Sequence, residues 1–391
     1  MTRPPAGVVP LVGVVGTVGV PARYGGFETL AEQLARNTDP ARARLLLYGQ
    51  KSAYAADERL GDFAGHRRHF MPLSANGVQS MAHDALTMLH AALVARVDVL
   101  LVLGTSGAWA LPLLRLLRPS LRIVTNIDGL EWRRDKFGTW AKRLLKTLEW
   151  FAVRSSHAVI ADNAALVPIV RGIHAIDPVL IAYGGDHVQV AATPGPVPQG
   201  HWLAIARIEP ENNSAMILQA AAAAGVPLIF VGNWDTNAYG RALKSQWGNT
   251  PGLTLHDPIY DQPTLARLRA GAIGYVHGHS VGGTNPSLVE ALFETDRILA
   301  FDCAFNRATL DDLGAYFSSA SALAAAMTAK SDGVIAFEAL QPLRNRYRWD
   351  NIASAYRNVM LGNDNSLSKG PLNAESRLDD NQPGSSARTT I

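Results

Sequence analysis

The feature that most restricts the fold of this chain is a regular alternation of short apolar runs with longer helical patterns. In the first part of the chain, apolar runs predict buried strands at residues 11–16, 43–49, 97–104, 121–126, 157–162 and 178–183. Helices are predicted between them at residues 26–37, 78–94, 107–117, 139–155 and 163–172. Such alternation is typical of a mainly parallel sheet with helices on both faces.

The alternation starts again after residues 191–200, whose sequence AATPGPVPQG predicts a linker because its prolines and glycines suit neither a helix interior nor a central strand. Strands are then predicted at 202–206, 227–232, 253–256, 272–277 and 297–302, and helices at 211–224, 238–248, 262–270, 286–294 and 319–330. Two such series predict an α/β protein with two Rossmann-like, parallel-sheet domains that face each other across a cleft.

These patterns divide the chain into regions. We expect a first domain over residues 1–190, the linker over 191–200 and a second domain over 201–342, while residues 343–361 form a last helix or helix pair that packs back on the first domain. Residues 362–391 are nearly free of large apolar side chains, which predicts a disordered tail.

Composition excludes several classes of function. A formal net charge of +3 is too small to indicate a nucleic-acid partner, and a lone cysteine, Cys303, forms no internal disulfide. The apolar stretch at residues 8–20 resembles a signal peptide, but its three glycines favour a buried strand that runs into a loop. No run reaches the roughly 18 apolar residues of a membrane span. We therefore expect a cytoplasmic protein that lies at most on the inner membrane face.

The loop after the first strand is the first candidate site, because ligands of open parallel sheets bind beyond the carboxyl ends of the strands. It ends in Tyr24, Gly25 and Gly26, with Glu28 in the helix that follows. Adjacent glycines let the backbone approach a ligand, and a helix N-terminus favours an anion. The alternative is a tight turn that any doubly wound sheet needs. The dinucleotide pattern GxGxxG is absent, which weighs against an NAD-linked oxidoreductase.

A second candidate follows the strand at 121–126, where the sequence NIDGLEWRR contains Asp128 and Glu131. Carboxylates at a strand end can act as a base or bind sugar hydroxyls. The alternative is that they cap the next helix. Beyond them, Trp140, Leu144, Leu148 and Phe151 form one stripe of the helix at 139–155, which we interpret as core, with membrane contact as the alternative. Nearby basic and aromatic residues form a patch that could meet an anionic lipid or a pyrophosphate acceptor; they are Trp132, Arg133, Arg134, Lys136, Lys142, Arg143 and Lys146.

The second half carries the densest signal, in VHGHSVGGTNPSLVE at residues 276–290. A predicted anion cradle of Gly282, Gly283, Thr284 and Asn285 precedes a helix that starts with Pro286. Glu290 lies one turn into that helix and could reach a ribose. His277 and His279 are interpreted as hydrogen-bonding residues, with a metal site as the weaker alternative. Upstream, Arg207 follows the first strand of this half and could bind a diphosphate through two hydrogen bonds.

These residues make the chain similar to a known family. The matching stretches are GTVGVPARYGGFETLAEQLA, NIDGLEWRRDKF, VIADN, IAYGGD, ARIEPENN and YVHGHSVGGTNPSLVEAL, between about residues 11 and 300. They resemble the family 4 glycosyltransferases of GT-B fold, and more narrowly the bacterial rhamnosyltransferase-like branch that makes capsule, O-antigen or exopolysaccharide. The resemblance implies retaining transfer from a nucleoside-diphosphate sugar, without metal or cofactor, to a saccharide or lipid-diphosphate-linked acceptor. Thymidine-diphosphate rhamnose is the donor that this branch implies.

The resemblance also implies roles for single residues. Gly25 and Gly26 would approach the donor phosphate or the acceptor, and Arg207 would bind the donor diphosphate. Glu290 would correspond to the second glutamate of the family's paired motif and contact the ribose, through its 3′-hydroxyl only if the nucleoside is thymidine. Asp128 falls near a histidine of many relatives that touches the transferred sugar.

Two departures from the family are visible. Gly282 stands where the wider family has its first glutamate, and Asn212 stands where it has a lysine on the diphosphate. Thr284, Asn285 and His279 are the candidates to replace the first contact, and the catalytic candidates are Asp128, Glu131 and His279. Two alternatives stay open, namely a sugar-nucleotide epimerase or hydrolase of GT-B-like fold, and a non-catalytic nucleotide-sugar-binding subunit.

Overall fold

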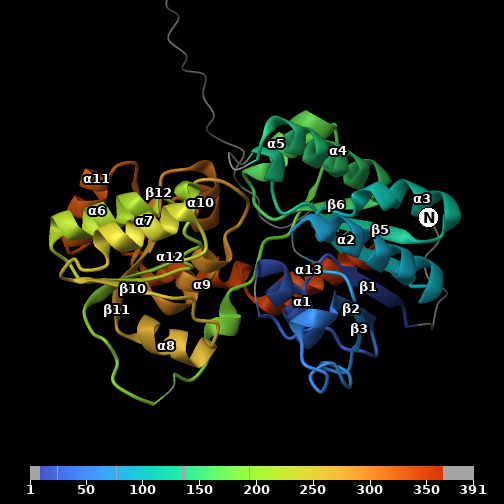
Figure 1. Cartoon of the computed structure of the whole chain (residues 1–391), viewed down its shortest axis with the longest axis horizontal. Coiled ribbons are helices and arrows are strands. Elements are labelled where there is room, and N and C mark those ends of the chain that lie inside the picture. The colour runs from blue at the N-terminus through green and yellow to red at the C-terminus, as the bar shows by residue number, and fades with distance from the viewer. Residues whose placement is uncertain (1–8, 24, 76, 134–136, 193, 364–391) are drawn as a thin grey trace, which may run out of the picture.

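The computed structural model describes residues 9–363, except residues 24, 76, 134–136 and 193. Most of the predicted tail, from residue 364 onward, therefore lies outside the described residues, as do Tyr24, Arg134 and Lys136. The described chain forms two parallel sheets, each with its own helices, and the two α/β bodies lie side by side (Figure 1). None of the described helices has the length and apolarity needed to cross a membrane.

The first sheet has seven parallel strands in the order β3-β2-β1-β4-β5-β6-β7. Their bounds are β1 Leu11–Val15, β2 Arg44–Gln50, β3 Arg67–Met71, β4 Val99–Leu103, β5 Arg122–Asn126, β6 Ala158–Ala161 and β7 Val179–Leu180. The helices are α1 Gly26–Arg36, α2 Ser80–Leu89, α3 Leu111–Leu117, α4 Thr139–Ser155 and α5 Leu166–His174. A π-helical turn, η3 His90–Val94, extends α2, and short 3-10 turns are η1 Lys51–Ala53, η2 Gly77–Gln79, η4 Ala108–Ala110, η5 Glu131–Arg133 and η6 Asp186–Val188.

The second sheet has six parallel strands in the order β10-β9-β8-β11-β12-β13. They are β8 His201–Ile205, β9 Leu228–Val231, β10 Leu253–His256, β11 Ala272–His277, β12 Ile298–Phe301 and β13 Ala315–Phe317. The 3-10 turn η7 Pro210–Asn212 precedes the helices α6 Ser214–Ala224, α7 Ala238–Trp247, α8 Gln262–Ala270, α9 Pro286–Glu294, α10 Ala304–Leu310 and α11 Ala320–Thr328. The described residues of 191–200, between the two sheets, form no helix or strand.

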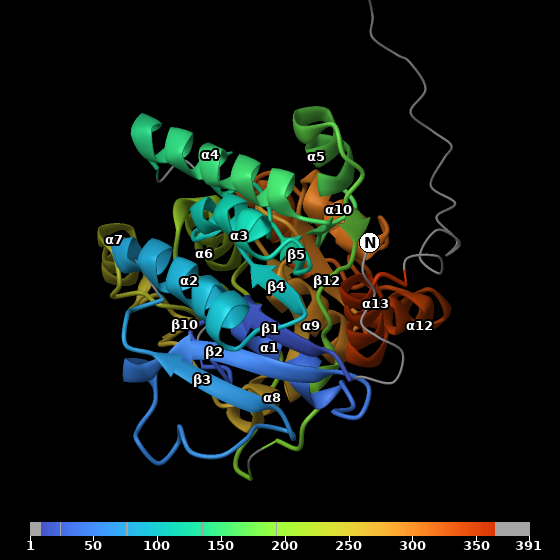
Figure 2. The same cartoon turned by 90° about the vertical axis from the view of Figure 1, so that its right-hand side faces the viewer.

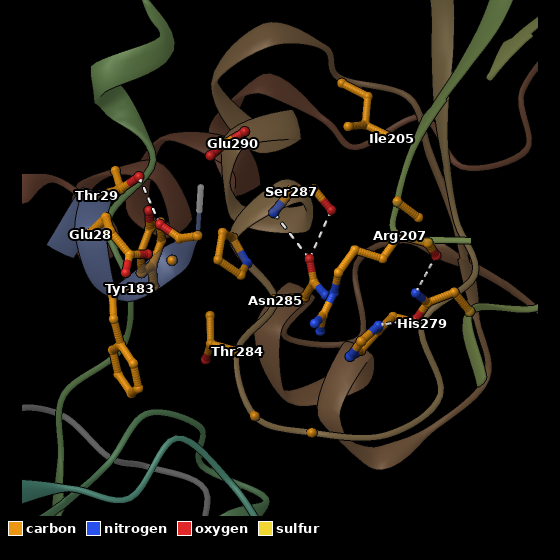
Figure 3. Close-up of a pocket in the computed structure, with 18 of the residues that line it drawn as sticks. Glu28, Thr29, Tyr183, Ile205, Arg207, His279, Thr284, Asn285, Ser287 and Glu290 are labelled. Carbon is orange, nitrogen blue, oxygen red and sulfur yellow. Dashed lines mark hydrogen bonds between the residues drawn. The ribbon is translucent and has the colours of Figure 1, made fainter. Parts of the chain in front are cut away.

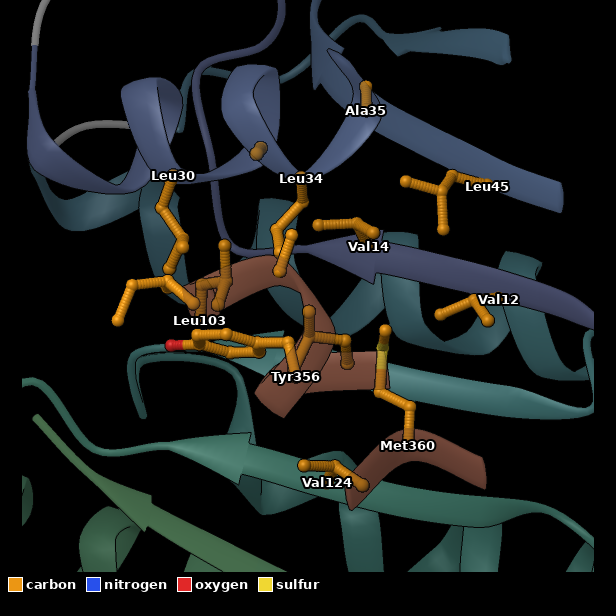
Figure 4. Close-up of a cluster of buried hydrophobic side chains, with 14 of the residues drawn as sticks. Val12, Val14, Leu30, Leu34, Ala35, Leu45, Leu103, Val124, Tyr356 and Met360 are labelled. Atoms are coloured by element: carbon orange, nitrogen blue, oxygen red, sulfur yellow. The ribbon is translucent and has the colours of Figure 1, made fainter. Parts of the chain in front are cut away.

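The last two helices pass from one domain to the other (Figure 1). In α12 Phe337–Arg346, Leu340 and Leu343 belong to the core of the second domain. In α13 Trp349–Leu361, Tyr356 and Met360 pack instead with Val14 and Leu34 of the first domain (Figure 4). Burying a large side chain of this kind contributes about 1.5–3 kcal/mol. The last helix of the described residues is therefore part of the first domain's core.

The two faces of the first sheet carry different helices. One face packs against α1 and α13, while the other supports α2, η4, α3 and α4 (Figure 2). The strands at the centre of this sheet are buried on both sides, which explains the continuous apolar runs of β1 and β4.

The predicted strands and helices correspond to observed ones, and sequence patterns missed three elements. The edge strand β3 has the sequence RRHFM, which is partly exposed and lacks an apolar run. Edge strand β13 has only three residues, and α10 has seven. Helix α6 begins at Ser214 rather than 211, because Asn213 has a φ of 51° that interrupts the helical geometry.

Candidate active site

The loops at the carboxyl ends of both sheets line a single cavity of about 830 Å³ between the two domains. All thirteen described residues that the sequence marks as a site lie on its wall: Gly25, Gly26, Glu28, Asp128, Glu131, Arg207, Asn212, His279, Gly282, Gly283, Thr284, Asn285 and Glu290. These residues come from segments up to 265 positions apart (290 − 25). They come together only because the loops at the carboxyl ends of one sheet pack against those of the other sheet.

On the first-domain side, Glu28 organises the glycine loop. Its side chain is 6% exposed, and its Oε1 accepts a hydrogen bond of 2.7 Å from the backbone N–H of Val18. A Cβ atom on Gly25 would lie 2.8 Å from the other carboxylate oxygen of Glu28, so a side chain at position 25 would have to displace that oxygen. Burial raises the pKa of Glu28. The carboxylate therefore holds the loop from inside.

Glycines also lie where the two domains approach each other closely. A Cβ atom on Gly26 would lie 3.1 Å from Cγ of Pro286, and one on Gly129 would lie 3.3 Å from the backbone nitrogen of Gly283. Gly129 has a φ of 110°, a conformation that favours glycine. The start of α9 thus approaches the start of α1, and the loop before α9 approaches the β5–α4 loop.

Thr284 connects the two domains through its hydroxyl group. Thr284 is 6% exposed, and its hydroxyl donates to the backbone carbonyl of Asp162 at the end of β6. The side-chain amide of Asn163 donates to Thr284 Oγ1 at 3.3 Å and to Thr309 Oγ1 at 3.2 Å. We expected this hydroxyl in an anion cradle, but it is directed into the domain contact because polar groups buried there need partners.

The carboxylates Asp128 and Glu131 lie on the first-domain rim. Asp128 is exposed and has a φ of 56°, and its backbone N–H donates to Asn126 Oδ1 at 2.9 Å. The amide of Asn126 donates in turn to the hydroxyl of Tyr356 at 2.6 Å. Helix α13 therefore supports the turn that presents Asp128. Glu131 is half-buried in η5.

On the second-domain side, Asn212 links two other site residues. Asn212 is 2% exposed, its Nδ2 donates to the backbone carbonyl of Arg207 at 2.6 Å, and its Oδ1 bonds to Nδ1 of His279. A Cβ atom on Gly282 would lie 3.2 Å from Nε2 of His279, and Gly282 has a φ of 116°. The imidazole therefore stands beside the position where the resemblance predicts a glutamate.

The start of α9 is capped by Asn285. Its Oδ1 accepts from the backbone N–H of Ser287 at 3.1 Å and from the Ser287 hydroxyl at 2.7 Å (Figure 3). This carboxamide satisfies one of the amides that the first turn of a helix leaves without intrahelical partners. Because α9 has nine residues and opens toward the cavity, its N-terminus presents a partial positive charge there.

The carboxylate of Glu290 contacts two side chains, Arg269 and His187, that the sequence did not indicate. Nη2 of Arg269 lies 2.9 Å from one carboxylate oxygen, and Nε2 of His187 lies 3.4 Å from the other. The indole N–H of Trp349 donates to His187 Nδ1 at 2.9 Å, so the proton of the neutral imidazole is on the nitrogen that faces Glu290. No local pattern could identify these partners, because His187 lies 103 positions (290 − 187) and Arg269 lies 21 positions (290 − 269) from Glu290.

His277 is a further residue of the cavity wall. It is 3% exposed, burial lowers its pKa, and its Nε2 has no hydrogen-bond partner among the described residues. The described part of the chain contains no group of three or more His, Cys, Asp or Glu side chains placed to hold a metal ion.

No family model and no curated protein matches this sequence. Solved structures do match. A sucrose-phosphate synthase from Thermosynechococcus elongatus has a TM-score of 0.71 at 15% identity, over 90% of this chain and 100% of that chain. HepE from Anabaena, in complex with UDP and glucose, has a TM-score of 0.67 at 15% identity, over 90% and 100%.

The catalytic domain of starch synthase IV from Arabidopsis thaliana, bound to ADP and acarbose, has a TM-score of 0.63 at 12% identity, over 92% of this chain and 100% of that chain. Similarity over nearly the whole length, together with two facing parallel sheets, shows that this chain has the two-domain, Rossmann-like GT-B fold. The fold class predicted from the sequence is therefore confirmed.

Proposed function

We propose that this protein is a glycosyltransferase that moves a sugar from a nucleoside diphosphate to an acceptor hydroxyl. The observation that carries the proposal is the convergence of thirteen predicted site residues from both domains on one cavity. Two neighbours of the same fold, HepE in complex with UDP and starch synthase IV bound to ADP, support a nucleoside diphosphate here. Fold alone does not determine function, which depends on the side chains of the site.

The nucleotide would lie against the second domain. Arg207 is exposed at the end of β8, where its guanidinium can bind the diphosphate, and the N-terminus of α9 adds a favourable field. Glu290 would accept hydrogen bonds from the ribose, with its orientation maintained by Arg269 and His187. Arg207 and the N-terminus of α9 are positive groups beside the diphosphate, and fixed groups of this kind stabilise the negative charge that develops on a departing diphosphate.

The reacting end of the sugar would lie between His279 and the carboxylates Asp128 and Glu131. The transfer breaks the bond from the anomeric carbon to the diphosphate oxygen and forms a bond to the acceptor oxygen. The acceptor proton passes to the departing diphosphate, and the resemblance supports retention of configuration. We further propose that His279 replaces the contact of the family's first glutamate, since it occupies the space beside Gly282.

The donor and acceptor follow from the resemblance. We propose thymidine-diphosphate rhamnose as the donor and a saccharide on a lipid diphosphate as the acceptor, in the synthesis of a cell-surface polysaccharide. Arg133 lines the first-domain side of the cavity and is a basic residue there that could meet an acceptor diphosphate. The proposal includes transfer without a metal ion, so EDTA should leave the rate unchanged.

The test is calorimetric titration with a panel of nucleoside-diphosphate sugars. We expect one donor to bind clearly best, and Arg207→Ala to weaken it by about 10- to 100-fold, the range for loss of a charge-assisted hydrogen bond. Arg171→Ala is the matched control, since Arg171 is ion-paired with Asp177 outside the cavity and should bind normally. Absence of binding by every nucleotide sugar would contradict the proposal.

A second assay separates transfer from the two alternatives. Labelled donor is incubated with and without a lipid-linked acceptor. Transfer to the acceptor with little free sugar supports the proposal. Rapid formation of free sugar or an epimer without acceptor would indicate a hydrolase or epimerase, and binding without any transfer would indicate a non-catalytic subunit.

A further inference from the structure

Exposed apolar side chains gather on two neighbouring helices of the first domain. Seven of the seventeen exposed large apolar residues in the described chain belong to α3, α4 and the turn before α3. They are Trp109, Leu113, Leu116, Leu117, Trp140, Leu144 and Trp150, and we name this set the α3–α4 face. Helices α3 and α4 pack against each other and lie on the same side of the first sheet (Figure 2).

Helix α4 shows how the face is built. Its inner side buries Leu148 and Ala152, whereas Trp140 is 80% exposed and Leu144 is 46% exposed. The expectation that the whole stripe from Trp140 to Phe151 is core is therefore wrong for its N-terminal half, because α4 extends past the sheet that would cover it (Figure 2). The exposed side repeats every three or four residues, through Trp140, Arg143, Leu144, Thr147, Trp150 and Arg154.

The charge of this face is positive. Helices α3 and α4 carry five basic residues: Arg115, Lys142, Arg143, Lys146 and Arg154. Their one acidic residue, Glu149, is 2% exposed and bonds internally to His174 at 2.7 Å and to Trp132 at 3.0 Å. Trp and Leu interspersed with Arg and Lys match the interface of an anionic bilayer, where apolar groups enter the acyl boundary and cations meet the headgroups. A second copy would bring like charges together.

The face also borders the candidate active site. The ring of Trp132 in η5 contacts two cations: the guanidinium of Arg133 lies 5.3 Å from the ring centroid, and the ammonium of Lys146 of α4 lies 5.2 Å from it. Arg133 and Glu131 of the same turn line the cavity. A continuous path of basic and aromatic groups thus connects α4 with the first-domain wall of the cavity.

We propose that the α3–α4 face docks this protein on the surface of an anionic phospholipid bilayer. Docking in this orientation would place the first-domain wall of the cavity next to the membrane. The binding itself does not depend on the proposed activity, whereas its purpose, access to a lipid-linked acceptor, rests on that proposal.

The experiment is co-sedimentation of the full chain with phosphatidylglycerol–phosphatidylcholine vesicles and with phosphatidylcholine vesicles. We expect binding to the anionic vesicles that falls at high salt, and at least tenfold weaker partition for Trp140→Ser/Leu144→Ser and for Arg143→Glu/Arg154→Glu. Phe337→Ser is the control, since Phe337 is 67% exposed on α12, away from the face. Unchanged thermal unfolding of each variant confirms that the fold is intact.

Three results would overturn the docking proposal: no binding of the wild-type chain to anionic vesicles, equal binding by the variants, or a wild-type dimer that Trp140→Ser/Leu144→Ser dissociates in sedimentation. The assay contains no nucleotide, so its failure leaves the calorimetric test of the active site unaffected. If the chain binds vesicles but no nucleotide sugar, the docking proposal stands and the proposed activity is contradicted.

Discussion

Gly283 of the second domain faces the carboxylate of Asp162 in the first domain so closely that a Cβ atom on Gly283 would overlap it. Asp162 is 7% exposed at the end of β6, and its neighbour Asn163 bonds to Thr284. The two domains can therefore make this contact at the edge of the cavity only because Gly283 has no side chain.

Gly283→Ala is therefore expected to disturb this contact. The added methyl must displace a buried carboxylate, and overpacking of this kind typically costs about 1–3 kcal/mol. Thermal unfolding should show a lower Tm, and calorimetry should show weaker donor binding. Gly172→Ala is the control, because Gly172 lies in α5 with no atom within 4 Å of an added Cβ. Unaltered Tm and affinity in Gly283→Ala would be inconsistent with the observed packing.

Asp162 should make stability depend on pH. Burial raises its pKa from 3.8 to about 7, so between these values the native state holds a proton that the unfolded state has released. Its contribution to the free energy of unfolding therefore falls as pH rises from about 4 to about 7. Asp162→Asn removes this dependence, so the variant should gain stability relative to wild type between pH 5 and pH 8 in urea unfolding. An equal difference at both pH values would refute this account.

His187 is expected to act through Glu290. Without the imidazole, Glu290 keeps its ion pair with Arg269 but loses the contact with His187, and its carboxylate can leave the ribose side of the cavity. We expect His187→Ala to raise the donor KM about 3- to 10-fold with little change in kcat. This is the effect of losing one hydrogen bond in substrate binding, here the bond between Glu290 and the ribose. In a Glu290→Gln background, His187→Ala should add little further effect. Full additivity of the two substitutions would argue against positioning.

Asn212→Lys installs the residue of the wider family, and we expect it to harm this protein. The position is 2% exposed, and the substitution removes the bonds to the Arg207 carbonyl and to His279 while it buries an amine. Tm should fall and donor affinity should weaken. Asn249→Lys, at an exposed position after α7, is the control and should be neutral. Tighter donor binding at unchanged Tm would show that position 212 can accommodate a lysine.

Short-range patterns determined the class of the fold. The apolar runs and the glycines and prolines between them depend on interactions within about ten residues, so they predicted the strands, the helices and the two sheets. The rule that ligands lie beyond the carboxyl ends of parallel strands then placed Arg207 and Asp128 on loops that share one cavity.

Tertiary structure alone decided what those residues contact. The Thr284 hydroxyl turns to Asp162, Glu290 meets His187 and Arg269, and half of the apolar stripe of α4 remains outside the core. Each outcome depends on which distant segments pack together and on where a sheet stops covering a helix. A sequence pattern records that a side chain is polar or apolar, but its partner is set by the three-dimensional packing that satisfies every buried group at once.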